Sequence, residues 1–102
     1  MKINTERVLK TIDGKNLKKE DNIDVSVGDA IVNSLLANFP DEHNLSGEEK
    51  VKRYALAIKV HQNADPDLSV DDLSLIKKLV GKMYSALIVG QMWEILEGKK
   101  DK

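Results

Sequence analysis

The stretch Ser69–Gly98, SVDDLSLIKKLVGKMYSALIVGQMWEILEG, is the longest run of the chain with a regular spacing of apolar residues. These residues recur at steps of three and four, the spacing that keeps side chains on one stripe of an α-helix. The stripe is formed by Leu73, Ile76, Val80, Met83 and Leu87. The run therefore predicts a core-forming helix, and the rest of the chain has to cover its buried face.

The length, composition and charge of the chain limit the classes of protein that it can represent. It has 102 residues, no cysteine and a formal net charge of −1. A chain of this length is a single domain that folds without a disulfide or a metal. The absence of cysteine excludes a thiolate nucleophile and a Cys-ligated metal centre. The balanced charge gives no general attraction to nucleic acid or to anionic lipid.

The N-terminus and the apolar runs favour a cytoplasmic protein without membrane contact. The first ten residues, MKINTERVLK, lack the apolar segment of a signal peptide. No apolar run approaches the roughly 18 to 20 residues that cross a bilayer. We therefore expect the chain to act in the cytoplasm.

The N-terminal segment, about residues 1–20, predicts a small β-hairpin. Ile3 to Ile12 alternates loosely, and Asp13-Gly14 tolerates the positive φ of a tight turn. The return strand, Lys15 to Lys19, has three lysines and one leucine, so it would form a solvated edge. An irregular loop is the alternative. A phosphate site on these lysines is disfavoured by the acidic residues that follow, namely Glu20, Asp21 and Asp24.

Three Ser-x-x-acid signals mark the starts of helices. Each offers a hydroxyl that accepts from the third helical N–H and a carboxylate that reaches back to the cap. The pairs are Ser26 with Asp29, Ser46 with Glu49, and Ser69 with Asp72. Because Glu fits the capping box better than Asp, the middle signal is the strongest of the three.

The first two helices are bounded by these caps and by proline. The first extends from about Val27 to Asn38 and ends before Pro40, because a residue that precedes proline is biased away from the helical region. The second extends from about Gly47 to Asn63. Its predicted inward face comprises Val51, Tyr54, Ala55 and Ile58. Arg53 is placed on the outer face, in an i,i+4 pair with Glu49.

The third helix begins after Ser69 and is predicted to break between Lys82 and Ser85, because Gly81 weakens its last turns. A fourth helix follows, and Gly98 caps it before a charged tail, residues 99–102. Residues 1–98 thus predict one mainly α (α+β) domain of three to four helices with an N-terminal hairpin.

The sequence contains no signature of a metal, cofactor or catalytic site. Oxygen-bearing side chains alternate from Asp65 as in a calcium loop, but Val70 and Ile76 stand where that loop needs glycine and a bidentate carboxylate. His43 is predicted to be a solvated loop residue, and His61 a packed or capped group at the edge of the core. The best serines are explained as helix caps, so we expect no enzyme, no cofactor and no metal.

The stretches SVGDAIVNSLL, LSGEEKVKRYALAIKV and DLSVDDLSLIKKLVGKMYSALIVGQMWEIL together resemble a group of small proteins encoded in tailed-phage and prophage genomes. The resemblance covers the chain from the hairpin to Leu96 and consists of helices and their spacing. It implies a phage-derived protein in the cytoplasm of a host cell. It carries over no functional residue.

The fourth helix is the candidate partner-binding surface. From about Ala86 to Leu96 it is apolar on most of its circumference, which is more than the first two helices can cover. Gly90 would let a second backbone approach. The candidate residues are Ile88, Met92, Trp93, Ile95 and Leu96. The alternative is that this helix is the middle of the bundle.

The function expected from these features is a non-enzymatic protein–protein interaction module, in phage assembly or as an accessory protein that modifies a host protein. The partner is a phage or host protein, or a second copy of the chain in a homodimer. A small nucleic-acid-binding regulator is the alternative. Asp71 and Asp72 disfavour it, because the start of the third helix would face phosphates in a helix-turn-helix.

Overall fold

The computed structural model describes residues 1–98, and in this part of the chain it contains four helices and no β-strand. The helices are α1 (Val27–Leu36), α2 (Gly47–Gln62), α3 (Val70–Met83) and α4 (Ala86–Leu96). The mainly α class is therefore confirmed. The break predicted between Lys82 and Ser85 is present, since α3 ends at Met83 and α4 begins at Ala86. The charged tail, residues 99–102, lies outside the described residues.

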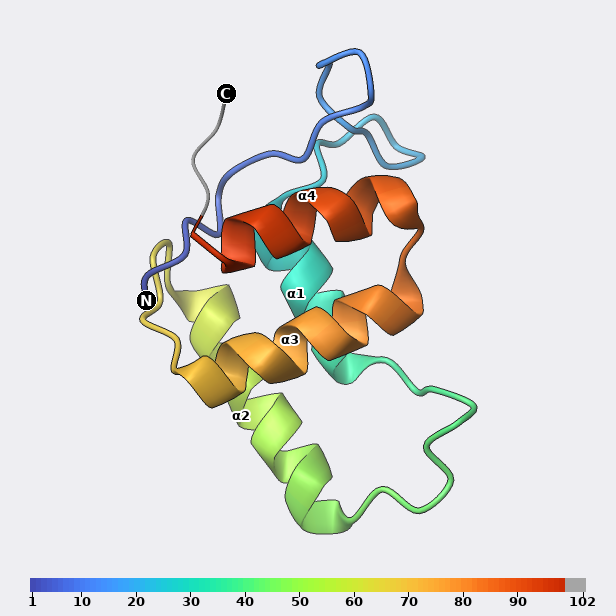
Figure 1. The fold of residues 1–102 in the computed structure, drawn as a ribbon, viewed down its shortest axis with the longest axis vertical. Coiled ribbons are helices and arrows are strands. Elements are labelled where there is room, and N and C mark those ends of the chain that lie inside the picture. The colour runs from blue at the N-terminus through green and yellow to red at the C-terminus, as the bar shows by residue number, and fades with distance from the viewer. Residues whose placement is uncertain (99–102) are drawn as a thin grey trace.

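Helix α1 lies at the centre of the arrangement. It packs against both α2 and α3, while α3 and α4 run antiparallel beside each other and cover it (Figure 1). Its buried residues are Val27, Ala30, Ile31, Ser34 and Leu35. The predicted stripe of α3 is confirmed in its middle, where Ile76 and Val80 are buried together with Leu79. Met83, at the end of that stripe, is exposed.

All three serine caps predicted from the sequence are present. The hydroxyls of Ser26, Ser46 and Ser69 each accept a hydrogen bond from the third helical N–H, at 3.1 Å. The ranking of the caps is wrong, however. The carboxylates of Asp29 and Asp72 complete a capping box, whereas Ser46 caps α2 through its hydroxyl alone. An aspartate therefore closes the box here as well as a glutamate would.

The predicted N-terminal hairpin, residues 1–20, is not formed. In its place the described chain has isolated antiparallel bridges, none of which extends into a ladder. They join Lys2 to Asp67, Val8 to Ser26, Lys10 to Asn16, and Lys18 to Asp24. The segment follows three short arms and two turns instead of two paired strands, and its turns project beyond α4 (Figure 1).

The three arms close a ring of backbone hydrogen bonds. The N–H of Leu9 donates to the carbonyl of Val25 at 2.9 Å, that of Leu17 to Leu9 at 2.8 Å, and that of Val25 to Leu17 at 2.9 Å. These residues are spaced by eight, and each arm contributes one apolar side chain to or against the core. A two-stranded hairpin would have left Val25 unpaired, so the ring satisfies more backbone groups.

The ring reflects an eight-residue repeat in the sequence, RVLKTIDG, KNLKKEDN and IDVSVGDA, which starts at Arg7. Each copy has an apolar third residue and an aspartate at the seventh position. In the first two copies the eighth residue, Gly14 or Asn22, has a positive φ of 88° or 64° and turns the chain. In the third copy α1 begins, and Asp29 becomes part of its capping box.

Within the described chain, a close backbone approach occurs at Gly28. A Cβ at Gly28 would lie 3.1 Å from both the Cβ and the carbonyl oxygen of Thr5, and the Gly28 N–H donates to that oxygen at 2.8 Å. A Cβ at Gly90 would meet nothing within 4 Å. Glycine at position 28 therefore lets the N-terminal segment lie directly on the first turn of α1.

Candidate protein-binding groove

The residues predicted to bind a partner lie mostly inside the domain. Met92, Ile95 and Leu96 are buried in the core, and Ile88 packs partly buried against it. These four apolar side chains pack against other parts of the same chain, as expected if α4 is a core helix. Trp93 alone remains open to solvent, with 41% of its surface exposed.

Trp93 is held in place by α3. Its indole Nε1 donates to the carbonyl of Lys77 at 3.2 Å, and the Lys77 ammonium lies 4.8 Å from the centre of the ring. Glu97 accepts from the same ammonium at 2.9 Å. The exposed indole therefore joins α3 to α4, and its hydrogen-bond donor is already used.

The apolar surface that the domain leaves open lies on α2 and α1. Val51 and Tyr54 were predicted to point inward, but they are 66% and 60% exposed. The residues of α2 that are buried instead are Arg53, Leu56, Ala57 and Val60. The predicted inward face of α2 is therefore wrong, because the helix is rotated about its axis. Leu36, at the end of α1, is 56% exposed beside it.

The rotation of α2 follows from a buried ion pair. Arg53 donates from both terminal nitrogens to Glu42, at 2.8 and 2.7 Å, and both side chains are almost completely buried. Lys82 adds contacts to Asp41 and Glu42 at 3.0 and 3.4 Å. Because Arg53 faces the core, Val51 and Tyr54 face away from it. The predicted pair between Glu49 and Arg53 is thus replaced by a pair with the preceding loop.

The contacts of this pair favour the charged form of both side chains. Hydrogen bonds from Arg53 lower the pKa of Glu42 to about 2, in spite of the opposing effect of burial, and the charge of Lys82 contributes. The same contact raises the pKa of Arg53. The guanidinium Nε has no hydrogen-bond partner within the described chain.

A groove of about 240 Å³ lies between α1 and α2 and is almost purely apolar. Its lining residues are Val32, Leu36, Tyr54, Ala57, Ile58 and His61. Leu36 and Tyr54 are the exposed large apolar residues of this lining, whereas Ala57 is buried. Exposed apolar residues that share one hollow are a better sign of an interaction surface than isolated ones, which are common everywhere. We call this hollow the α1–α2 groove.

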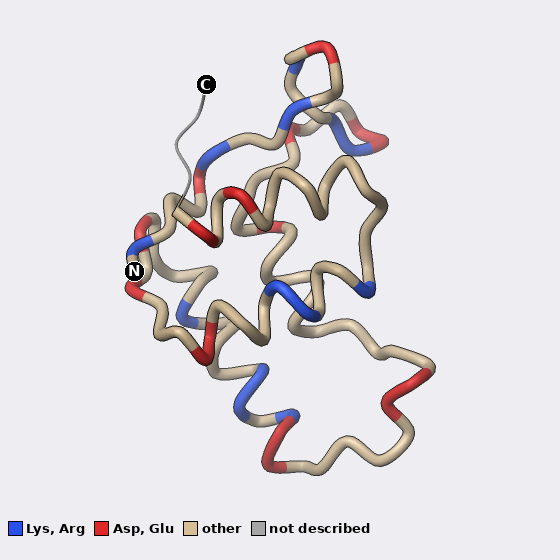
Figure 2. Tube along the Cα trace, viewed as in Figure 1, with Lys and Arg blue, Asp and Glu red and all other residues tan. Residues whose placement is uncertain are grey.

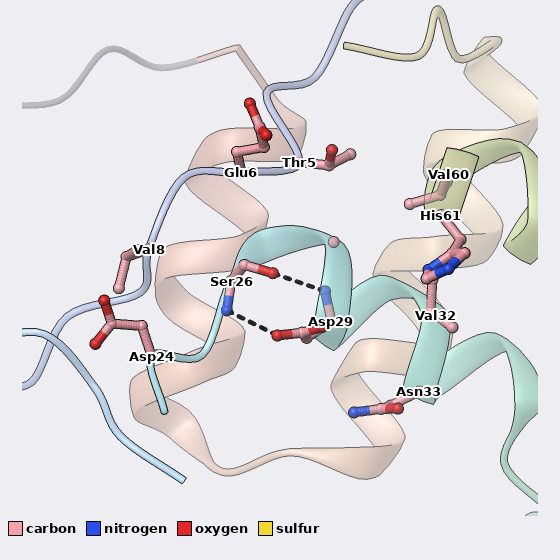
Figure 3. Close-up of a pocket in the computed structure, with 11 residues that line it drawn as sticks. Thr5, Glu6, Val8, Asp24, Ser26, Asp29, Val32, Asn33, Val60 and His61 are labelled. Atoms are coloured by element: carbon pink, nitrogen blue, oxygen red, sulfur yellow. Dashed lines mark hydrogen bonds between the residues drawn. The ribbon is translucent and has the colours of Figure 1, made fainter. Parts of the chain in front are cut away.

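A second hollow, of about 590 Å³ and with both polar and apolar lining, adjoins the groove and shares Val32 and His61 with it. In Figure 3, Glu6 and Asp24 come from the N-terminal segment, Asp29 and Asn33 from α1, and His61 from α2 at the opposite side. His61 is exposed at this junction and is not a packed group at the core edge as predicted. We call this second hollow the carboxylate hollow.

Two of the three carboxylates of this hollow have partners. A hydrogen bond from Lys18 lowers the pKa of Asp24. Partial burial opposes ionisation of Asp29, but hydrogen bonds from Ser26 and Lys19 outweigh it, so its pKa is also lowered. The Lys19 ammonium lies 3.2 Å from Asp29. Glu6 has no side-chain partner among residues 1–98, although its backbone N–H is bonded to Asn4.

The described residues bring together no candidate metal site. Residues 1–98 contain no group of three or more His, Asp or Glu side chains placed to hold a metal ion. His43 is exposed in the loop before α2, as predicted, and Asp65 and Asp67 flank the turn before α3. None of the helices in this part of the chain is long and apolar enough to cross a membrane. Over the described residues, Lys and Arg are interspersed with Asp and Glu (Figure 2).

Compared with protein-family models, with curated proteins and with solved structures, the chain has no significant match.

Proposed function

We propose that the chain is a non-enzymatic protein–protein interaction module that binds its partner in the α1–α2 groove. The observation that carries this proposal is the exposure of Leu36 and Tyr54 along one apolar hollow. Leaving such side chains in water forgoes the free energy of their burial, about 25 cal/mol for each Å². A partner that covers the groove recovers that free energy.

The occupant that fits this groove is a segment of a protein that presents an apolar anchor. The walls are two helices, α1 and α2, and a helix or extended segment laid between them would contact both. Tyr54 supplies a large, rigid contact of the type enriched in interfaces. Trp93 and Gly90 form a second exposed area on α4, but the indole there is bound to α3.

The proposed partner is a phage protein or a host protein. The chain would act in particle assembly or in the modification of a host protein. Both parts of this proposal rest only on the resemblance of the helical stretches to phage-encoded proteins. Nucleic acid is a poorer occupant. The groove offers no cluster of basic residues, and the first turn of α3 carries Asp71 and Asp72. A cytoplasmic location is part of the same proposal.

Photo-crosslinking tests the groove directly. With p-benzoylphenylalanine in place of Tyr54, irradiation in the native host is expected to yield one discrete adduct, because the exposed ring faces the groove. Mass spectrometry of the adduct identifies the partner, including a second copy of the chain if the mass doubles.

Two aspartate substitutions serve as the matched pair for this experiment. Leu36→Asp places a charge in the groove and should abolish the adduct, since desolvating that charge is costly. Ile12→Asp makes the same kind of change at a residue that is 94% exposed on the first turn, outside the groove, and should leave the adduct intact. An adduct that survives Leu36→Asp would refute the groove as the binding site.

A further inference from the structure

The carboxylate hollow adds chemical selectivity to the α1–α2 groove, and this inference rests on the proposed function. We propose that the bound segment carries a lysine or arginine next to its apolar anchor, with the anchor in the groove and the cation in the carboxylate hollow. The two hollows share Val32 and His61, so one short segment can occupy both.

The charges around the carboxylate hollow favour a cation. Glu6, Asp24 and Asp29 line it, and His61 is the one basic-type side chain among its lining residues. Asp24 and Asp29 stay ionised because their pKa values are lowered, and their partners Lys18 and Lys19 are outside the lining. Glu6 adds a negative charge that no described side chain balances. Lys18 and Lys19 offset the charges of Asp24 and Asp29, so the carboxylate left to attract a cation beside the apolar wall is Glu6.

A basic side chain matches this layout in shape as well as in charge. Lysine and arginine bury an apolar stem along apolar surface and keep the charged head in a polar environment. Here the stem would pass Val32 at the junction, and the head would reach the carboxylates beyond it (Figure 3). An acidic side chain at the same place would meet Glu6, which repels it.

Three matched fragments test the inference on the full chain: 4-phenylbutylamine, 4-phenylbutan-1-ol and 4-phenylbutyrate. All three have the same apolar arm, and only the charge of the head differs. Titration of the ¹⁵N-labelled protein, followed through the amide signals of Val32, Asn33 and His61, gives a Kd for each. The amine should bind about two- to fivefold more tightly than the alcohol, as expected for a partly exposed ion pair, and the butyrate most weakly.

Substitutions separate the two hollows. Glu6→Gln should remove most of the advantage of the amine, while Glu48→Gln, an exposed carboxylate of α2 outside both hollows, should leave it unchanged. Tyr54→Ala should weaken all three fragments alike. About 0.5 M NaCl should reduce the difference between amine and alcohol, because salt screens exposed charges.

The outcomes distinguish the failure of this inference from that of the groove. If the amine, the alcohol and the butyrate bind equally and Tyr54→Ala weakens all three, the bound segment needs no cation, but the groove remains the binding site. If Tyr54→Ala does not change the binding, or if no fragment at about 10 mM shifts the signals of Val32, Asn33 and His61, both the cation and the groove are refuted.

Discussion

Helices α2 and α4 are both apolar on more than one side, yet the domain uses them in opposite ways. Helix α4 turns Met92, Ile95 and Leu96 into the core and keeps only Trp93 half in solvent. Helix α2 turns Val51 and Tyr54 outward and buries Arg53. The greater apolar character of α4 agrees with its burial, but it does not explain why α2 exposes Val51 and Tyr54 while it buries an arginine.

The difference shows that a polar contact can set the rotation of a helix when two apolar faces compete. The buried pair of Arg53 and Glu42 has charges that cannot be left unpaired without a large loss of stability. Helix α4 carries no such group on its buried side, so packing alone orients it. An exposed apolar face is therefore left on α2, where we place the groove.

The largest effect is expected from a charge in the core side of α4. Met92→Asp would bury an unpaired carboxylate at a completely buried position and should cost more than about 5 kcal/mol, enough to unfold the domain. Tyr54→Asp on the exposed face of α2 should change stability by less than about 0.5 kcal/mol. Thermal melts of the two variants measure the difference, and similar losses would mean that Tyr54 is part of the core.

The second effect concerns the ion pair that orients α2. Glu42→Ala leaves Arg53 buried without its partner and should cost about 3 to 5 kcal/mol at pH 7 in urea titrations. The folded-state pKa of Glu42 is about 2, below its usual 4.5, so its stabilising effect is present above pH 4.5 and is lost as the pH falls toward 2.

The difference in stability between the wild-type protein and Glu42→Ala should accordingly shrink as the pH falls from about 5 to about 2. Other carboxylates titrate in the same range, but they do so equally in both proteins and cancel in the difference. A difference that does not change with pH would show that Glu42 acts through packing and not through its charge.

Trp93→Ala should have an intermediate effect. The side chain is 41% exposed, so we expect a loss of about 1 to 3 kcal/mol, below the 3 to 5 kcal/mol of a fully buried tryptophan. Because its role is to join α3 and α4, the mass in light scattering should stay the same. If the variant keeps its stability but has a lower mass in light scattering than the wild-type protein, the partner-binding surface lies on α4.

The smallest effect comes from the caps of the same two helices. Ser46 caps α2 through its hydroxyl, whereas Ser85 precedes α4 without a side-chain hydrogen bond. Ser46→Ala should cost about 0.5 to 2 kcal/mol and Ser85→Ala clearly less, measured by urea denaturation. Equal losses would mean that the hydroxyl of Ser85 also caps its helix.

The boundaries of the fold could be predicted from the sequence because they depend on local chemistry. The serine caps, the proline after α1 and the weak point at Gly81 act within one turn of the helix, and they place the helix starts and the break before α4. The rotation of α2 could not be predicted in this way. It depends on Glu42, eleven residues before Arg53, and on a loop whose course the local pattern does not determine.

Two signals in the sequence would have improved the prediction. Leu56 and Val60, spaced by four, formed a second apolar stripe on α2 that competed with Val51 and Ile58. The eight-residue repeat from Arg7 to Ala30, with an apolar residue in every copy, indicated three arms instead of a hairpin. The groove is not apparent from the sequence, because the apolar spacing of α2 predicts that Tyr54 and Ile58 point into the core.

Cysteine labelling tests the rotation of α2 most directly, because the chain has no cysteine of its own. Val51→Cys and Val60→Cys make the same change on opposite sides of the helix. Val51 is 66% exposed and Val60 is 1% exposed. In the folded protein, Val51→Cys should react with a maleimide at about the rate of the urea-unfolded chain, and Val60→Cys at least about a hundredfold more slowly, as local opening limits it. Protection of Val51→Cys together with rapid labelling of Val60→Cys would contradict the rotation, and with it the α1–α2 groove.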